Sequence, residues 1–333
     1  GDTKAVYLDG AGSGAAVVDA FASLSTVDLK VQDDLTVTDD LIVGGDIDLE
    51  GAIDVNGTAN LDVVDIDGAV DMASTLQVDG AITGSSTING VGISSNITNF
   101  SQGILISNDA GTGTLDGANN NTGLGFEVFD DLTSGDQNTG VGVQALAKVT
   151  TGSNNNAFGE TALYTNTTGG NNVAMGRAAL ESNTTADNNT AIGHQSLKAN
   201  STGTTNVAVG SSALLANTTG TDNVAVGALA LDANTTASQN TAVGRNALTA
   251  NTTGHSGIAI GAYALNANTT GAYNLAIGRD TMVSNTTGTR NSAVGSNSLD
   301  ANTTGSHNIA FGYAALTANT TASYNIAIGD SAM

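Results

Sequence analysis

Residues 206–222 read NVAVGSSALLANTTGTD, and residues 223–239 read NVAVGALALDANTTASQ. The same unit recurs along the chain, because glycine stands at residue 125 and then at every 17th residue up to 329, with no insertion. A leucine, or a methionine at 282 and 333, follows four residues after each of these glycines from 142 onward. A fixed period is typical of solenoids, in which each repeat packs only on its neighbours. Residues 121–333 are therefore predicted to form a stacked architecture.

One repeat is too short for the helical solenoid repeats, which need about 33 residues or more. Seventeen residues suffice for two short strands and two turns, so we expect each repeat to form one coil of a parallel β-solenoid, or β-roll. Stacked strands lie ~4.8 Å apart, so twelve coils would extend roughly 58 Å. The fold class predicted for this part of the chain is all-β.

The repeated positions suggest which side chains face the interior of a coil. In the segment N-x-A-x-G, the residues on either side of the alanine are often apolar, so we expect them to point inward together with the leucines. The alanines would then face outward, where a small side chain permits close approach of another backbone, and they become candidates for a subunit interface. The predicted structural residues are Gly210, Gly227, Gly244, Leu214, Leu231, Val209 and Val226, and the interface candidates are Ala208, Ala225 and Ala242.

A shorter period precedes the coils. Between residues 33 and 84, apolar residues at i and i+2 return about every six residues, as in Leu35/Val37, Leu41/Val43 and Ile47/Leu49. Alternation of this kind is the period of a half-buried strand. Strands this short cannot bury two apolar faces within one thin chain, whereas three chains wound together could bury them at a shared axis. We therefore expect a triple β-helix-like shaft at 33–84.

The rest of the chain completes the domain organisation. Residues 1–32 are predicted to be an N-terminal attachment segment, and the Gly-, Ser-, Thr- and Asn-rich residues 85–120 a connector between the two periods. The sequence begins without a methionine and ends inside a repeat, so we expect both ends to be cuts in a longer polypeptide or a processed product.

Composition and charge exclude several classes of function. The net charge is −23, and the 333 residues contain no cysteine and no proline. The acidic residues are concentrated before residue 138, which disfavours nucleic acid and anionic membranes as partners because phosphate binding depends on Lys and Arg. No run of about 18 apolar residues exists, so we expect no membrane insertion. Thiolate catalysis and cysteine metal sites are excluded.

No residue pattern points to an enzyme. His194, His255 and His307 fall at different places in their repeats, and we interpret each as a solvent-facing residue. Glu181, Asp232 and Asp300 share one place in the repeat, but the first two are three coils apart, roughly 14 Å by strand spacing. Glycosidase carboxylates lie about 5 to 9.5 Å apart. We expect no cofactor; the alternative is a Ca²⁺ site where Asp residues of the shaft from three chains converge.

The two periods carry a resemblance to known families. The apolar hexads of 33–84 resemble the shafts of bacteriophage tail fibres. The unit N-x-A-(I/V)-G of 121–333 resembles the head repeat of trimeric autotransporter adhesins of the YadA type, and similar N-T-A-I-G repeats with A-L and N-T-T-G occur in phage tail fibres. This resemblance implies a left-handed parallel β-roll assembled as a homotrimeric fibre.

The leading hypothesis is a structural protein of a phage tail fibre that presents or contributes to host-receptor binding. Its partners would be two copies of itself, a host cell-surface glycan or protein receptor, and other virion tail proteins, and its location the virion tail fibre, outside the cell. The alternative is a bacterial trimeric surface adhesin or extracellular appendage subunit. A third hypothesis, an ice-binding β-solenoid, comes from the abundance of threonine rows.

Overall fold

The computed structural model describes residues 6–8, 17–19, 87–88, 91–97, 100–107 and 115–333. The chain divides into two units, residues 1–77 and 78–333. In the first unit, strand β1 (Val6–Leu8) pairs antiparallel with β2 (Val17–Asp19). The predicted shaft at 33–84 lies outside the described residues, so the triple β-helix stays a prediction.

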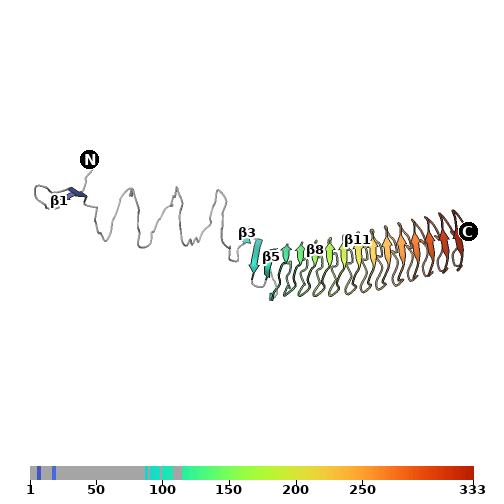
Figure 1. The fold of residues 1–333 in the computed structure, drawn as a ribbon, viewed down its shortest axis with the longest axis horizontal. Coiled ribbons are helices and arrows are strands. Elements are labelled where there is room, and N and C mark those ends of the chain that lie inside the picture. Colours follow the sequence, from blue (N-terminus) through green and yellow to red (C-terminus); the bar gives the residue numbers. More distant parts are fainter. Residues whose placement is uncertain (1–5, 9–16, 20–86, 89–90, 98–99, 108–114) are drawn as a thin grey trace. The chain divides into compact units, whose positions relative to one another are not determined.

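The second unit contains a parallel β-solenoid with one strand in every 17-residue coil (Figure 1). Successive strands pair in register, so that Ala208 lies beside Ala225 and Ala225 beside Ala242. The described residues contain no helix, and the predictions of an all-β fold and of a 17-residue solenoid period are confirmed. The strands are β6 (Thr122–Leu124), β7 (Thr139–Val141), β8 (Asn156–Phe158), β9 (Val173–Met175), β10 (Thr190–Ile192), β11 (Val207–Val209), β12 (Val224–Val226), β13 (Thr241–Val243), β14 (Ile258–Ile260), β15 (Leu275–Ile277), β16 (Ser292–Val294), β17 (Ile309–Phe311) and β18 (Ile326–Ile328).

We number the coil positions 1 to 17 from the residue that precedes each strand, so that Asn206 is at position 1 and Asp222 at position 17. A second strand was expected in each coil, and the structure has none there. The residues at positions 7 and 9, Ser212 and Leu214 in this coil, have φ of 56° and 52°. Left-handed residues at alternate positions turn the backbone too sharply for an extended strand. The segment that carries the leucine at position 9 is therefore a series of turns and not a second strand.

A β-ribbon precedes the first coil, inside the predicted connector 85–120. Strands β3 (Thr87–Ile88), β4 (Val91–Ile97) and β5 (Phe100–Ser107) pair antiparallel, and β5 then pairs parallel with β6. Leu105 of β5 is 1% exposed and packs over Gly123. The ribbon thereby occupies the first edge of the parallel sheet, where unpaired backbone groups would otherwise be exposed.

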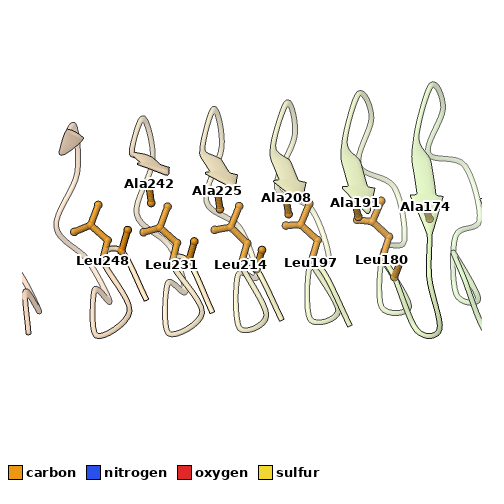
Figure 2. Close-up of a cluster of buried hydrophobic side chains, with 14 of the residues drawn as sticks. Ala174, Leu180, Ala191, Leu197, Ala208, Leu214, Ala225, Leu231, Ala242 and Leu248 are labelled. Carbon is orange, nitrogen blue, oxygen red and sulfur yellow. The ribbon is translucent and has the colours of Figure 1, made fainter. Parts of the chain in front are cut away.

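The interior of each coil is narrow. It holds the alanine at position 3, a small residue at position 8 and the leucine or methionine at position 9, as Figure 2 shows for Ala208 and Leu214. The first coil has the bulkier Val128 and Phe129 at positions 8 and 9, and both this coil and the next have glycine at position 3. A Cβ on Gly123 would lie 2.6 Å from Leu105 Cδ1 and 3.1 Å from Phe129 Cδ2. At the start of the solenoid, the lost volume on the strand is therefore replaced by larger side chains on the opposite side of the interior.

Two buried rows of asparagine connect the coils. At position 1, the N–H of Asn206 donates to Oδ1 of Asn189 at 3.0 Å, and its Nδ2 donates to the carbonyl of Gly220 at 2.8 Å. At position 12, Nδ2 of Asn217 donates to Oδ1 of Asn200 at 2.9 Å and to the carbonyl of Gly220 at 3.0 Å. Buried amides are tolerated only when their polar atoms are paired. These rows hold the turns of successive coils together.

The glycine at position 5 is required by the stacking of backbones. Gly210, Gly227 and Gly244 have φ of 132°, 138° and 137°, which side-chain-bearing residues rarely adopt. A Cβ on Gly227 would lie 2.6 Å from the carbonyl carbon and oxygen of Gly244 in the next coil. The glycine period therefore marks the place where the coils approach most closely through their main chains.

Candidate functional site: an apolar row on the outer face of the sheet

The outer face of the solenoid sheet carries an uninterrupted row of large apolar side chains at position 4. Leu124 is 48% exposed, Met175 42% and Val226 36%. Every coil contributes one such residue, and because the strands pair in register, the side chains lie beside one another from coil to coil. We name these residues the apolar row: Leu124, Val141, Phe158, Met175, Ile192, Val209, Val226, Val243, Ile260, Ile277, Val294, Phe311 and Ile328.

Position 2 lies on the same face and widens the row in several coils. Ile258 is 40% exposed, and valine, leucine or isoleucine occupies this position in six other coils. In the remaining coils it is Thr, Ser or Asn, as at Thr241. A contiguous exposed apolar surface of this extent is typical of an interaction site.

The faces of the strand are the reverse of those predicted. Ala208, Ala225 and Ala242 are fully buried inside the coil, whereas Val209 and Val226 lie on the outer face. The prediction was wrong because it placed the larger side chains in the interior. One leucine from the opposite wall already fills most of that space, so only a methyl group fits on the strand. The buried alanines are excluded from a subunit interface, and their flanking residues take that role as candidates.

The other predicted structural residues lie where they were expected. Leu214 and Leu231 are buried in the interior row of leucines (Figure 2). Gly210, Gly227 and Gly244 lie at the coil-to-coil approach described above. The leucines and glycines thus hold the coil together, while the outer residues remain available for contacts.

Charged side chains form pairs between coils at positions 6 and 10, away from the apolar row. At position 6, Arg177 Nε lies 3.1 Å from Glu160 Oε2, and Arg177 Nη1 lies 3.4 Å from His194 Nε2. At position 10, Lys198 Nζ lies 3.1 Å from Glu181 Oε2. These pairs join neighbouring coils at the solvent-exposed surface, where an ion pair contributes about 0–1 kcal/mol. They do not form a site for chemistry.

The three histidines are not brought together. His194 lies at position 6, His255 at position 16 and His307 at position 17. Within the described part of the chain, no three His, Asp, Glu or Cys side chains are grouped so that they could hold a metal ion. The acidic shaft residues proposed as an alternative Ca²⁺ site lie outside the described ranges.

Asp232 at position 10 has an unusual environment. It is half-buried, and its Oδ1 makes no hydrogen bond. Burial raises the pKa of this carboxyl group, while the backbone N–H groups of Ala233 and Asp232 oppose the rise. Glu181 and Asp300 occupy the same coil position at least three coils away, so no carboxylate of that set pairs with Asp232.

Among the described residues, no helix has the length and apolar character needed to cross a bilayer. The fold and the apolar row together define a parallel β-solenoid with one lateral apolar surface. Comparison with family models, curated proteins and solved structures found no match. The function must therefore be argued from the residues of the chain.

Proposed function

We propose that the chain is a structural fibre protein whose copies associate side by side through the apolar row as a homotrimer. The observation that carries this proposal is one large apolar residue per coil on the outer face of the sheet, each of them exposed or half-buried. If the copies associate in parallel about an axis along the stack, equal coils lie at equal heights, and the row of each chain meets the same row of the others. Three rows of β-branched and aromatic residues can then form a shared core.

The energetics favour such an association. Val226 is already about two-thirds buried in its own chain, so burying the remainder contributes only part of the ~1.5–3 kcal/mol of a whole side chain. The row repeats this small gain in every coil and in every chain. Its summed contribution is large enough to offset the ~4–15 kcal/mol of lost translational and rotational freedom.

Within this class, we propose a bacteriophage tail fibre located outside the cell on the virion, with a host glycan or protein receptor and other tail proteins as partners. The support is the resemblance of the N-x-A-(I/V)-G unit to fibre repeats, together with a shape that grows by one strand spacing per coil. A bacterial trimeric surface adhesin is the alternative. Any sequence found beyond residue 333 would separate the two, since a chaperone domain would favour the fibre and a β-barrel anchor the adhesin.

The ice-binding hypothesis depends on the threonines at positions 13 and 14. Thr218 Oγ1 donates to the carbonyl of Thr235 at 3.0 Å, so its hydroxyl is engaged in stacking, whereas Thr219 is exposed. Only the second threonine of each pair is therefore free to form an outward row. Thermal hysteresis of the purified protein would support the ice-binding hypothesis, and its absence would refute it.

The trimer is tested by measuring mass with light scattering. We expect about three times the 32.8 kDa of one chain. The double variant Val209→Asp/Val226→Asp should shift the mass toward one chain, because it would place carboxylates from three copies around a dry axis at several kcal/mol per ion. Thr202→Asp/Thr219→Asp, on the exposed position 14, is the matched control and should keep the mass. A monomeric wild type, or an unchanged mass in the Val variant, would refute the proposal.

A further inference from the structure

The last coils carry a second, chemically different surface at position 17. In the earlier coils this position holds amide, hydroxyl or carboxyl side chains, such as Asn188, Thr205 and Gln239. From coil to coil it then holds Tyr273, Arg290, His307 and Tyr324, and His255 precedes them at position 16. We name these five residues the aromatic–cationic strip.

The side chains of the strip order one another. The rings of His255 and Tyr273 meet edge to face with centroids 4.8 Å apart, and the guanidinium of Arg290 lies 5.3 Å from the Tyr273 ring centroid. The rings of His307 and Tyr324 stack with centroids 4.8 Å apart and an interplanar angle of 7°. Side chains that are held in place before binding lose less conformational entropy when a ligand arrives.

The backbone conformation at position 17 does not require these residue types. Position 17 is left-handed in every coil, with φ of 60° at Tyr273 and 55° at Arg290. Asparagine adopts this conformation readily, and Asn120, Asn154 and Asn171 occupy it in earlier coils. Tyrosine and arginine adopt it at greater conformational cost. The backbone conformation therefore does not explain why Tyr, Arg and His follow one another at this position.

Four of the five strip residues are exposed, His307 is half-buried, and no acidic residue lies among them. Tyr273 is 51% and Tyr324 77% exposed, and His255 and Arg290 are also exposed. No Asp or Glu occurs at positions 15 to 17 of these coils or at the position 1 that follows each of them. In a chain of net charge −23, this edge offers a phenol, a guanidinium and imidazoles side by side. Such a row donates hydrogen bonds to carboxylate and hydroxyl oxygens.

We propose that the aromatic–cationic strip binds an extended carboxylated polysaccharide along the fibre. A linear sugar polymer presents ring hydroxyls and carboxylates at regular intervals, and the strip presents one donor group per coil at ~4.8 Å intervals. Nucleic acid fits less well, because its binding depends on Lys and Arg pairing with phosphates and the strip has a single arginine. The phenols and imidazoles of the strip suit the hydroxyl groups that make up most of the surface of a sugar polymer. This assignment rests on the proposed function, since it names the chemical class of the receptor.

The test measures binding of the full 333-residue chain to hyaluronate, alginate and polysialate by calorimetry, with neutral dextran and single-stranded poly(dT) as comparisons. The variant Tyr273→Asn/Arg290→Asn/His307→Asn/Tyr324→Asn restores the residue of earlier coils. We expect at least a tenfold loss of affinity for the acidic polysaccharide and a melting temperature no lower than that of the wild type. Arg245→Asn is the control, because Arg245 packs on Tyr263 at 5.6 Å in the same manner on a different edge of the coil.

Three outcomes would overturn the assignment. These are no binding to any of the three acidic polysaccharides, unchanged affinity in the asparagine variant, or equal or tighter binding of dextran or poly(dT). A lower melting temperature with unchanged affinity would assign the strip to folding alone. Mass is measured on the same samples, so the two proposals fail separately: a monomer that binds acidic polysaccharide refutes the trimer, and a trimer that binds none refutes the strip.

Discussion

Gly257 interrupts the buried asparagine row at position 1, and replacing it with asparagine should stabilise the protein. Its N–H donates to Oδ1 of Asn240 at 2.8 Å, as in other coils, but glycine offers no side-chain oxygen to the N–H of Asn274 in the following coil. It also offers no amide to the carbonyl of Gly271, the group that corresponds to the acceptors used by Asn240 and Asn274. Gly257→Asn would supply both hydrogen bonds.

The magnitude follows from these contacts. Two buried hydrogen bonds contribute about 1 kcal/mol each, and removing a glycine from the unfolded chain adds about 0.4–1 kcal/mol. Gly257 is outside the left-handed region, and a Cβ there would lie 3.2 Å from Asn240 Oδ1, at a position that asparagine occupies in the other coils. The conformational entropy lost by the new asparagine side chain, together with this close contact, offsets part of the gain in free energy of unfolding. We expect a net stabilisation of about 1.5 kcal/mol, or roughly 3–6 °C in melting temperature for a 150–250-residue solenoid.

Thermal unfolding by circular dichroism and hydrogen exchange of the Asn274 amide measure the effect. If the whole stabilisation is added to the free energy of the local opening that exposes the Asn274 amide, exchange of that amide slows about tenfold. Gly254→Asn is the control, because a Cβ at Gly254 would meet the carbonyl oxygen of Gly271 and should destabilise the coil. A Gly257→Asn protein that melts no higher and exchanges no more slowly would refute the role assigned to the asparagine row.

Three further variants test the packing of the interior, the requirement for glycine at position 5 and the half-buried Asp232. Ala225→Leu should lower the melting temperature by overpacking the interior, at about 1–3 kcal/mol, whereas Val226→Leu on the outer face should change it little; the opposite ranking would restore the predicted faces. Gly227→Ala should destabilise by more than about 1 kcal/mol, as judged by denaturant unfolding, because its Cβ would meet the next backbone at 2.6 Å. Burial raises the pKa of Asp232, so its charge destabilises the folded state above that pKa, and stability returns as pH falls toward the unfolded value of about 4. Asp232→Asn should therefore melt higher than wild type at pH 7 and lose that advantage at acid pH, with Asp300→Asn measured alongside; a constant difference across pH would contradict this.

The period and the residues that create it could be predicted from the sequence. Gly227 recurs because the next backbone passes where its side chain would be, and Leu231 recurs because one large residue fills each coil. Both restrictions act at the same place in every coil, so they leave an uninterrupted signal at 17-residue spacing. Periodicity of this kind identifies the architecture without any knowledge of the contacts.

The orientation of the strand could not be predicted from the same pattern. Alternation shows that Val224 and Val226 share one face and Ala225 the other, but it does not show which face is inside. The usual preference for burying the larger residue failed here because the coil is too thin for it. A signal was present in the first coils, where Gly123 and Gly140 replace the alanine beside the bulkier Val128 and Phe129. Volume exchange of this kind indicates that position 3 faces the interior.

Whether each candidate surface could be predicted also depends on whether its residues repeat from coil to coil. The apolar row repeats in every coil, so its residues were visible in the sequence although they were assigned to the wrong face. The strip at Tyr273, Arg290, His307 and Tyr324 does not repeat along the whole chain, and its members look like unrelated variants until the coils are stacked. Only the register between coils brings their rings within contact distance.

The buried asparagines at position 12 have a consequence for producing this protein. Asn217-Thr218-Thr219 is an acceptor triplet for N-linked glycosylation, and the same triplet recurs along the coils. In the folded chain, both hydrogens of Asn217 Nδ2 are donated within the stack, and the residue is fully buried. A glycan attached to this nitrogen during synthesis in a secretory pathway would replace a hydrogen bond to the preceding coil and could not fit in the buried row. A host cell that N-glycosylates secreted proteins would modify these asparagines before the chain folds and block the stacking, whereas a host without oligosaccharyl transferase leaves the position-12 asparagines unmodified and buried.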